Sequence, residues 1–171
     1  MSQVFLGVGS NIERDRYICA GLDALQNLFG ELRLSSVYDS PAIGFDGQPF
    51  LNLVVAVTTR LSVGELFGQL RQLEKAHGRP ENATRFSPRQ LDIDILTYDD
   101  LVGVIDGVVL PRDEVLHSAF VLRPLAELAP REQHPVDGRC YAQLWAALGD
   151  GAQTATRVDF FWQGRQVSFA E

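Results

Sequence analysis

The sequence predicts an α+β fold in which an antiparallel sheet carries helices packed on one face. Apolar or alternating runs at 4–9, 32–38, 50–59 and 90–98 have the composition and period of β-strands. Apolar residues at helical spacing fill the segment that ends at Gly30 and the segment 61–77. The resulting order, strand–helix–strand–strand–helix–strand, is that of the ferredoxin-like βαββαβ arrangement. We expect it to span residues 1 to about 98 and to leave the second face of the sheet free for a site.

Length and composition indicate one globular domain. The chain has 171 residues, of which 46% are hydrophobic, enough for a substantial core. We expect a single domain over 1–171, with a core at about 1–138 and a C-terminal extension at about 139–171. No apolar run approaches the roughly 20 residues of a membrane-spanning helix, and we expect no secretory signal. Cys19 and Cys140 are isolated thiols without metal-ligand spacing, which favours a reducing, cytoplasmic location.

The connections between these elements contain turn and capping residues. The first strand ends in Gly9-Ser10-Asn11, where Ser10 or Asn11 is suited to cap the following helix. A long loop rich in turn residues runs from Ser40 to Pro49, and loops of this length on a rigid scaffold often carry binding groups. The strand after it carries a single amide side chain, Asn52, close to that loop.

Beyond Tyr98 we expect a small hairpin, two helical segments and a second hairpin. The first hairpin lies within 101–110 around Asp106-Gly107, and the second lies within 158–169 around Gln163-Gly164. Helical patterns occur within 111–130 and at 141–148. Packing is the default role of the extension after about residue 140.

One alternating segment, from Arg85 to Leu96, carries the strongest sign of chemistry. Its apolar residues point toward a core, whereas Asp92 and Asp94 point together to the other face. Paired carboxylates resist partial burial unless a cation lies between them, and Mg²⁺ accepts one or two carboxylates together with water and phosphate oxygens. A simpler interpretation is an ordinary amphipathic strand whose acids are balanced by Arg85 and Arg89.

The charge distribution favours a small anionic ligand over a nucleic acid. The formal net charge is −7, which would repel a polyanion. Within that acidic total, five cations precede the two aspartates, and guanidinium groups among them are suited to hold phosphates. They are Arg71, Lys75, Arg79, Arg85 and Arg89. We therefore expect small-molecule partners, no nucleic acid and no membrane, and a monomer.

Taken together, these motifs resemble the 6-hydroxymethyl-7,8-dihydropterin pyrophosphokinases of folate biosynthesis. The similarity covers about residues 3 to 138, and the motifs occur in the same order. Each short motif is weak evidence, but the set that includes the segment from Arg85 to Leu96 is specific. The matching segments are 9–11, 35–41, 48–52, 73–79, 85–96 and 120–125.

The resemblance implies transfer of pyrophosphate from MgATP to the hydroxymethyl group of the pterin, with release of AMP. Two Mg²⁺ ions would be bridged by Asp92 and Asp94 and would hold the phosphate chain. Arg79 and Arg89 would neutralise charge on the transferred group and on the leaving AMP. The sequence shows no dedicated side-chain base, and activation by the metal would suffice.

The resemblance also assigns residues to the two substrates. Phe50 and Phe120 would stack on the pterin, and Asn52 would hydrogen-bond its amide-like edge. On residue type alone, the two phenylalanines would be core residues. The complete set for the pterin is Ser40, Pro41, Ile43, Phe50, Asn52 and Phe120; the set for ATP is Arg71, Glu74, Arg85, Arg89, Ile95 and Arg112.

Two departures from the family pattern fall on the ATP side. The chain has Pro111-Arg112 where Pro-His is usual, and Ser118 where an arginine usually precedes the later phenylalanine by two residues. The long guanidinium of Arg112 would replace part of the lost positive charge. Two other interpretations stay open: a non-catalytic pterin- or nucleotide-binding relative, and a metal-dependent nucleotidyltransferase, which also uses Gly-Ser and Asp-x-Asp.

Overall fold

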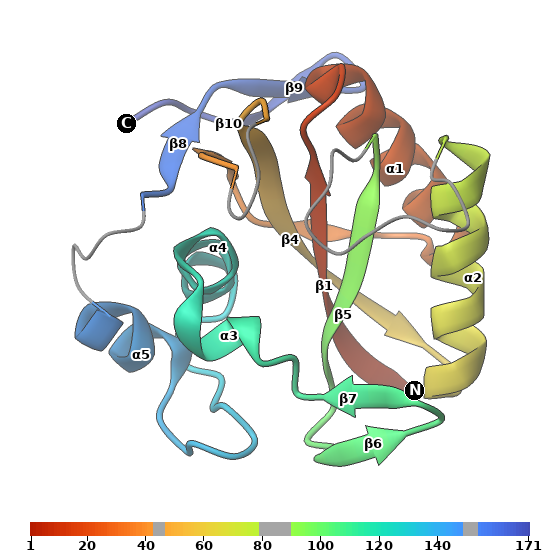
Figure 1. Ribbon diagram of the computed structural model, residues 1–171, viewed down its shortest axis with the longest axis vertical. Helices are drawn as coiled ribbons and strands as arrows, with labels where there is room; N and C mark the ends of the chain where they lie inside the picture. The colour runs from red at the N-terminus through yellow and green to blue at the C-terminus, as the bar shows by residue number, and fades with distance from the viewer. Residues whose placement is uncertain (43–46, 79–89, 149–153) are drawn as a thin grey trace.

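The computed structural model describes residues 1–42, 47–78, 90–148 and 154–171, and shows a mixed α/β fold built on an antiparallel sheet (Figure 1). Within these residues, six strands form the main sheet in the order β5-β1-β4-β3-β8, with β2 paired to β4. Every pairing in it is antiparallel. The strands are β1 (Ser2–Ser10), β2 (Arg33–Leu34), β3 (Val37–Ser40), β4 (Phe50–Thr59), β5 (Asp92–Tyr98) and β8 (Thr156–Val158).

Helices α1 (Arg14–Phe29) and α2 (Val63–Ala76) pack on one face of this sheet, as the apolar periodicity predicts (Figure 1). Alternate residues of β1, β4 and β5 point toward them, because side chains alternate between the faces of a strand. The main core lies in between. Its central members are Val4, Leu6, Val8, Ile18, Leu22, Leu25, Leu53, Val55, Leu66, Leu70, Ile93 and Ile95.

The two helices begin differently. In α2, the Ser62 side chain accepts a hydrogen bond from the Glu65 backbone N–H, and the Glu65 side chain accepts one from the Ser62 N–H. These two reciprocal hydrogen bonds form a capping box. In α1 the N-cap residue is Glu13 and no side chain caps the helix, so the expectation for Ser10 and Asn11 is wrong. Ser10 ends β1, and Asn11 donates to the Gln48 carbonyl at 3.1 Å.

The second predicted strand is divided into β2 and β3. Between them the Ser35 hydroxyl accepts a hydrogen bond from Val54 N at 2.8 Å, and Ser35 N donates to Val54 O at 2.9 Å. A side chain therefore takes one backbone hydrogen bond of β4 that a continuous strand would have taken. Ser35 is buried.

Three further helices lie on the opposite side of the sheet from α1 and α2 (Figure 1). They are α3 (Glu114–His117), α4 (Ala119–Leu128) and α5 (Tyr141–Leu148), and they form a second core. The sheet contributes Phe5, Val54, Ala56 and Leu96 to this core. The expectation of a free second face is therefore wrong for this part of the sheet.

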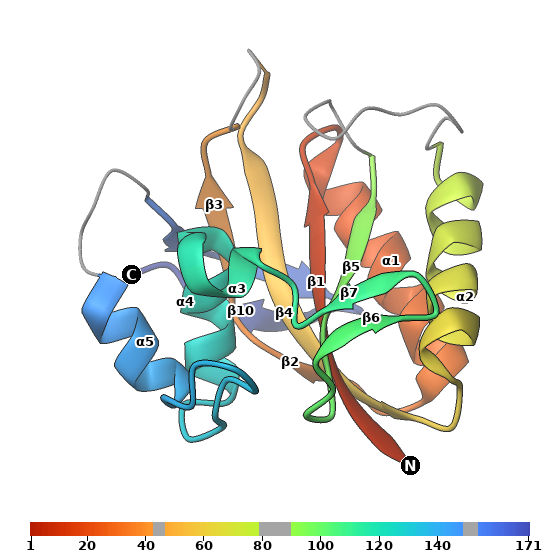
Figure 2. The same cartoon turned by 60° about the horizontal axis from the view of Figure 1, so that its bottom comes forward.

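The remaining strands form small hairpins; the one that follows β5 is seen in Figure 2, and the C-terminal one is labelled in Figure 1. Strands β6 (Gly103–Ile105) and β7 (Val108–Leu110) are joined by Asp106 and Gly107, both with positive φ, as an Asp-Gly turn predicts. Strands β9 (Phe160–Trp162) and β10 (Arg165–Ser168) turn at Gln163-Gly164. Within the described ranges, no helix is long and apolar enough to cross a membrane.

Candidate active site

The predicted acidic residues lie in a row of side chains that crosses the sheet. In register, Asp92 of β5 pairs with Gly9 of β1, Gly9 pairs with Asn52 of β4, and Asn52 pairs with Tyr38 of β3. Directly paired residues of antiparallel strands point to the same face. Asp92, Asn52 and Tyr38 therefore share one face, and Asp94, paired with Gly7, lies on it too. The predicted common face of the two acids is confirmed.

A buried glutamate holds the backbone between the two acids. Glu74 of α2 is 1% exposed, and its Oε2 accepts a hydrogen bond from Ile93 N at 2.8 Å. Its Oε1 lies 3.4 Å from Nη1 of Arg71. The charge-assisted hydrogen bond from Ile93 N to Glu74 fixes strand β5 against helix α2. The sequence carried no signal for this contact, because Glu74 stands within an amphipathic helix.

The environment of Asp94 disfavours its charged form. Burial raises the pKa of Asp94 well above its usual range, and the neighbouring Asp92 raises it further, while Arg112 lowers it. Arg112 lies between two acids: its Nε is 2.7 Å from Oε1 of Glu114, and its Nη2 is 3.7 Å from Oδ2 of Asp94. A further cation beside Asp92 and Asp94 would relieve this repulsion.

Two glycines in β1 leave room beside the acids. A Cβ added to Gly9 would lie 2.5 Å from Oδ1 of Asn52, so the Asn52 amide lies over this glycine. At Gly7 an added Cβ would approach Cδ2 of Leu96 at 3.3 Å. Between Asp92 and Asn52 the strand therefore presents no side chain of its own. The alternation of polar and apolar residues did not single out these glycines; their spacing of two residues within a strand was the available signal.

The residues expected at the pterin share this face or adjoin it. Ser40 is buried and its hydroxyl accepts a hydrogen bond from Asn52 Nδ2 at 3.1 Å, which fixes the amide. Phe50 pairs with Ser40 and follows the same alternation as Asn52. Phe120 is half-buried in the first turn of α4 and packs against the second core. Pro41 follows β3 and is exposed.

The residues expected at ATP are more dispersed. Ile95 is 5% exposed and its side chain belongs to the main core, so only its backbone remains for a ligand. Arg71 lies on α2 with its guanidinium 5.0 Å from the centre of the Phe67 ring. Arg112 reaches the acids, whereas His117 contacts Asp113 at 3.2 Å. Four expected site residues lie outside the described residues: Ile43, Arg79, Arg85 and Arg89.

The carboxylate pair offers two oxygen donors of the type that bind Mg²⁺. Among the described residues, no three or more His, Cys, Asp or Glu side chains are grouped to hold an ion. Two carboxylates with oxygen ligands from water and phosphate suffice for Mg²⁺, which rarely uses an all-protein cage. The donor set at Asp92 and Asp94 therefore fits magnesium held jointly with a phosphate ligand, and does not fit a structural zinc site.

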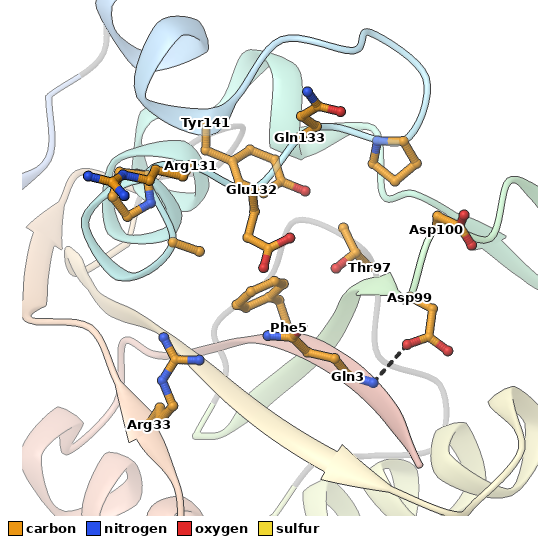
Figure 3. Close-up of a pocket in the computed structure, with 13 residues that line it drawn as sticks. Gln3, Phe5, Arg33, Thr97, Asp99, Asp100, Arg131, Glu132, Gln133 and Tyr141 are labelled. Atoms are coloured by element: carbon orange, nitrogen blue, oxygen red, sulfur yellow. Dashed lines mark hydrogen bonds between the residues drawn. The ribbon is translucent and has the colours of Figure 1, made fainter.

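A separate cleft lies at the other end of the sheet, and no sequence pattern predicted it. It has a volume of about 590 Å³ and lies between the strands and the loop that connects α4 to α5 (Figure 3). Glu132 extends over Phe5 there, and Asp99 accepts a hydrogen bond from Gln3 N at 2.8 Å. Phe5 pairs with Thr97, whereas the acids pair with Gly7 and Gly9, so the cleft and the acid pair occupy different parts of the sheet. Phe5 is 4% exposed, so its ring contributes little apolar surface to the cleft.

Comparison with known proteins identifies the family. The family model of 7,8-dihydro-6-hydroxymethylpterin-pyrophosphokinase (HPPK) matches residues 5–130. The chain belongs to this family. The match includes β1 from Phe5 onward, β2 to β5, the acid pair and α4, so the whole row of side chains lies within it.

Named relatives agree with the family model. The chain is 38% identical over 152 residues to the 2-amino-4-hydroxy-6-hydroxymethyldihydropteridine pyrophosphokinase of Pseudomonas aeruginosa, covering 86% of this chain and 92% of that one. It is 36% identical over 138 residues to the enzyme of the same name from Aquifex aeolicus, covering 80% and 86%. These relatives are enzymes of pterin pyrophosphoryl transfer, and the HPPK family uses ATP as co-substrate.

Solved structures show the same fold at low sequence identity. A crystal structure of Plasmodium falciparum HPPK-DHPS has a TM-score of 0.73 and 12% identity, and the match covers 98% of this chain and 50% of that one. Another HPPK-DHPS structure, in complex with substrates, has a TM-score of 0.71 and 11% identity, with coverage of 98% and 48%. The chain thus spans about half the length of these structural relatives.

Proposed function

We propose that this HPPK transfers pyrophosphate from MgATP to 6-hydroxymethyl-7,8-dihydropterin, giving the pterin diphosphate and AMP, and that Asp92 and Asp94 are its metal ligands. The observation that carries the assignment is the shared face of Asp92, Asp94 and Asn52, with Gly7 and Gly9 between them. This arrangement sets an acid pair beside a hydrogen-bonding amide without an intervening side chain. It suits a metal–phosphate group next to a flat polar heterocycle.

Asp92 and Asp94 would hold magnesium, and two ions are expected. When bound, magnesium neutralises the phosphate chain, makes the attacked phosphorus more electrophilic and favours ionisation of the pterin hydroxyl. The raised pKa of Asp94 supports this role, because a carboxylate held at unfavourable charge gains most from a cation. Glu74 would act indirectly, by fixing Ile93 and hence the spacing of the two acids.

Arginines would surround the phosphates. Arg112 already lies near Asp94 and carries a permanent charge. With Arg79, Arg85 and Arg89 it would offset the charge on the transferred group and the leaving AMP. Arg71 and the Ile95 backbone are proposed for the nucleotide; Glu74, also expected there, is buried against β5 and would contribute through that contact. The chain lacks the histidine and the arginine that are usual on the ATP side, but Arg112 faces the acid pair and keeps a positive charge there. This charge disfavours the interpretation as an inactive relative.

The pterin would occupy the Asn52 side of the site. The Asn52 amide is oriented by Ser40 and lies over Gly9, so it is held ready to hydrogen-bond a planar amide-like edge. Phe50 and Phe120 would contact the ring faces, and the backbone at Ser40, Pro41 and Ile43 would bind the remaining edge. A hydrogen-bonding site of this kind discriminates strongly against ligands that lack the matching groups.

The strand order supports a more specific fold class. The order β5-β1-β4-β3, with α1 and α2 on one face, supports classification as a ferredoxin-like βαββαβ arrangement extended by β8. The pairing of β8 with β3 supports a single domain over 1–171.

An assay of product identity tests the function. The purified protein is incubated with MgATP, with and without 6-hydroxymethyl-7,8-dihydropterin, and the nucleotide products are separated. We expect AMP that depends on the pterin and appears in equal amount to the pterin diphosphate. Release of inorganic pyrophosphate with a nucleotidylated product would instead indicate a nucleotidyltransferase. Pterin binding without AMP would indicate an inactive relative.

Substitution of Arg112 tests its part in binding ATP. We expect Arg112→Ala to raise the KM for ATP by about tenfold, the scale of one lost charge-assisted hydrogen bond. Arg112→Lys keeps the charge but not the planar fork, so its KM for ATP should lie between that of Arg112→Ala and that of the wild type. An unchanged KM for ATP in Arg112→Ala would exclude the compensating role.

A further inference from the structure

Arg123, on α4, connects three parts of the chain. Its guanidinium carbon lies 4.8 Å from the centre of the Tyr38 ring, and Nη1 donates a hydrogen bond to the Ala155 carbonyl. Ala119, one helical turn earlier on α4, packs against Tyr38 as well. The Tyr38 ring is 1% exposed. Residues of one face of α4 therefore cover a buried aromatic ring of β3.

The last residue of the sequence fixes this arginine. The two carboxylate oxygens of Glu171 lie 2.9 Å from Nη1 and 2.8 Å from Nη2 of Arg123, a bidentate pair. Oε1 of Glu171 also accepts a hydrogen bond from Arg157 N at 2.9 Å. Arg157 belongs to β8 and pairs with Tyr38 in register. One carboxylate thus joins α4 to the strand at the edge of the sheet.

The residues held by Glu171 adjoin the proposed pterin site on both sides. Tyr38 pairs directly with Asn52, which is proposed to bind the polar edge of the pterin. Ala119, which packs against Tyr38, immediately precedes Phe120, which is proposed to bind its ring face. The spacing between Asn52 and Phe120 therefore depends on how firmly the first turn of α4 rests on Tyr38.

We propose that Glu171 is a positioning residue: by clamping Arg123 over Tyr38 it sets the separation of Phe120 from Asn52, and so preforms the slot for a flat, polar heterocycle. This inference rests on the proposed function. It gives the extension after residue 139 a role beyond packing. If the slot is formed in a smaller fraction of the molecules, the apparent dissociation constant for the ligand rises in inverse proportion to that fraction.

The rest of α4 has a second attachment, so loss of the clamp should not unfold the protein. Glu127, one turn beyond Arg123, accepts hydrogen bonds from Ser36 N at 2.5 Å and from the Ser36 hydroxyl at 2.6 Å. The second core also buries Leu122 and Leu125. The clamp holds Arg123, one turn after Ala119, and therefore acts on the N-terminal half of the helix, where Phe120 lies.

The experiment compares Glu171→Gln with the wild type in steady-state kinetics and in direct pterin binding. The variant keeps the size of the side chain and removes the charge of the bidentate pair. We expect the KM for the pterin to rise about threefold to fivefold, the scale of one partly exposed ion pair, with kcat and the KM for ATP unchanged. Arg123→Lys should give the same change, because an ammonium provides no fork. The double variant should be no worse than either single variant.

A matched control exists elsewhere in the chain. Asp137 forms a bidentate pair with Arg139 at 2.7 and 3.0 Å in the loop before α5. Asp137→Asn removes a pair of the same kind and should leave the KM for the pterin unchanged. If Glu171→Gln leaves pterin affinity unchanged in an active wild-type background, or changes the constants for both substrates equally, the positioning role is wrong. An inactive wild type would instead contradict the proposed function.

Discussion

At the scale of single residues, the proposed site depends as much on a glycine, which has no side chain, as on the acidic and amide side chains. Alternation in the sequence predicted that Asp92 and Asp94 share a face, and the register confirms it. It did not predict that Gly9 leaves the space that Asn52 fills, since that contact joins two strands about 40 residues apart. Cross-strand contacts follow from register, which single-strand periodicity does not specify.

Gly9→Ala tests the close approach. The added methyl would lie 2.5 Å from Asn52 Oδ1, so the amide must move. We expect the KM for the pterin to rise by about tenfold or more, the scale of one lost hydrogen bond of a buried polar site, in steady-state assays. Gly7→Ala is the control: its methyl would lie 3.3 Å from the flexible Leu96 side chain, and the KM should change by less than about twofold. Equal effects of the two substitutions would contradict the role of Asn52.

Asp94→Asn tests the electrostatic cost of the acid pair. Burial and Asp92 raise the pKa of Asp94 in the folded state. The folded protein therefore binds a proton that the unfolded chain has released, and the free energy of unfolding falls as pH rises from the ordinary carboxyl pKa to the raised one. In Asp94→Asn the free energy of unfolding does not fall with pH for this reason, because the amide does not titrate. We expect it to be inactive yet more stable by about 1 kcal/mol at neutral pH.

The measurement is chemical denaturation of both proteins between pH 3 and neutrality. The two stabilities should converge at acid pH, where both side chains are uncharged, and diverge as the pH rises. A wild type that is the more stable at neutral pH would show that Arg112 compensates the repulsion within the acid pair fully. Magnesium with an ATP analogue should raise the melting temperature of the wild type but not that of the variant.

At the scale of elements, strand β5 combines a predictable half with an unpredictable one. Residues Leu91, Ile93 and Ile95 enter the main core as alternation predicts. The pairing then shifts between Phe5 and Leu6, so that Leu96 and Thr97 both leave the main core while Tyr98 returns to it. A bulge of this kind resets alternation and has no sequence signature here. Helix α2, with its capping box and apolar stripe, was the most predictable element.

Substitution of Glu74 tests how far α2 holds β5 in place. Glu74→Ala removes the acceptor of Ile93 N in a buried setting, and we expect a loss of about 1–3 kcal/mol in the free energy of unfolding together with a lower kcat. Glu74→Gln keeps an oxygen for that hydrogen bond and should recover most of the stability. Denaturation and turnover, measured on the same samples, distinguish an effect on the free energy of unfolding from an effect on kcat. Full activity of a destabilised Glu74→Ala protein would separate the strand contact from catalysis.

At the scale of the whole molecule, the C-terminal extension is part of the sheet. The sequence predicted its hairpin and helix α5, but not that β8 pairs with β3 or that Phe160 is buried in the main core. Short edge strands carry too few residues for a period to be recognised. The row Asp92–Gly9–Asn52–Tyr38 thus continues to Arg157, from the acid pair to the far edge.

Truncation tests this integration. Deleting residues 154–171 would expose Val37 and part of the main core and would remove the partner of Arg123. We expect the melting temperature to fall by at least about 10 °C, since burial of one aromatic side chain such as Phe160 alone is worth about 3 kcal/mol or more. Differential scanning calorimetry of both chains gives the comparison. An unchanged melting temperature would show that the extension folds separately from the sheet.

The most direct test of the central claim is turnover of Asp94→Ala measured beside its affinity for the pterin. If the acid pair holds the metal for pyrophosphoryl transfer, pterin-dependent AMP formation should fall by about a hundredfold or more, while the dissociation constant for the pterin stays within about threefold of the wild type. AMP formation at the wild-type rate would contradict the claim. So would a loss of turnover explained wholly by weaker pterin binding.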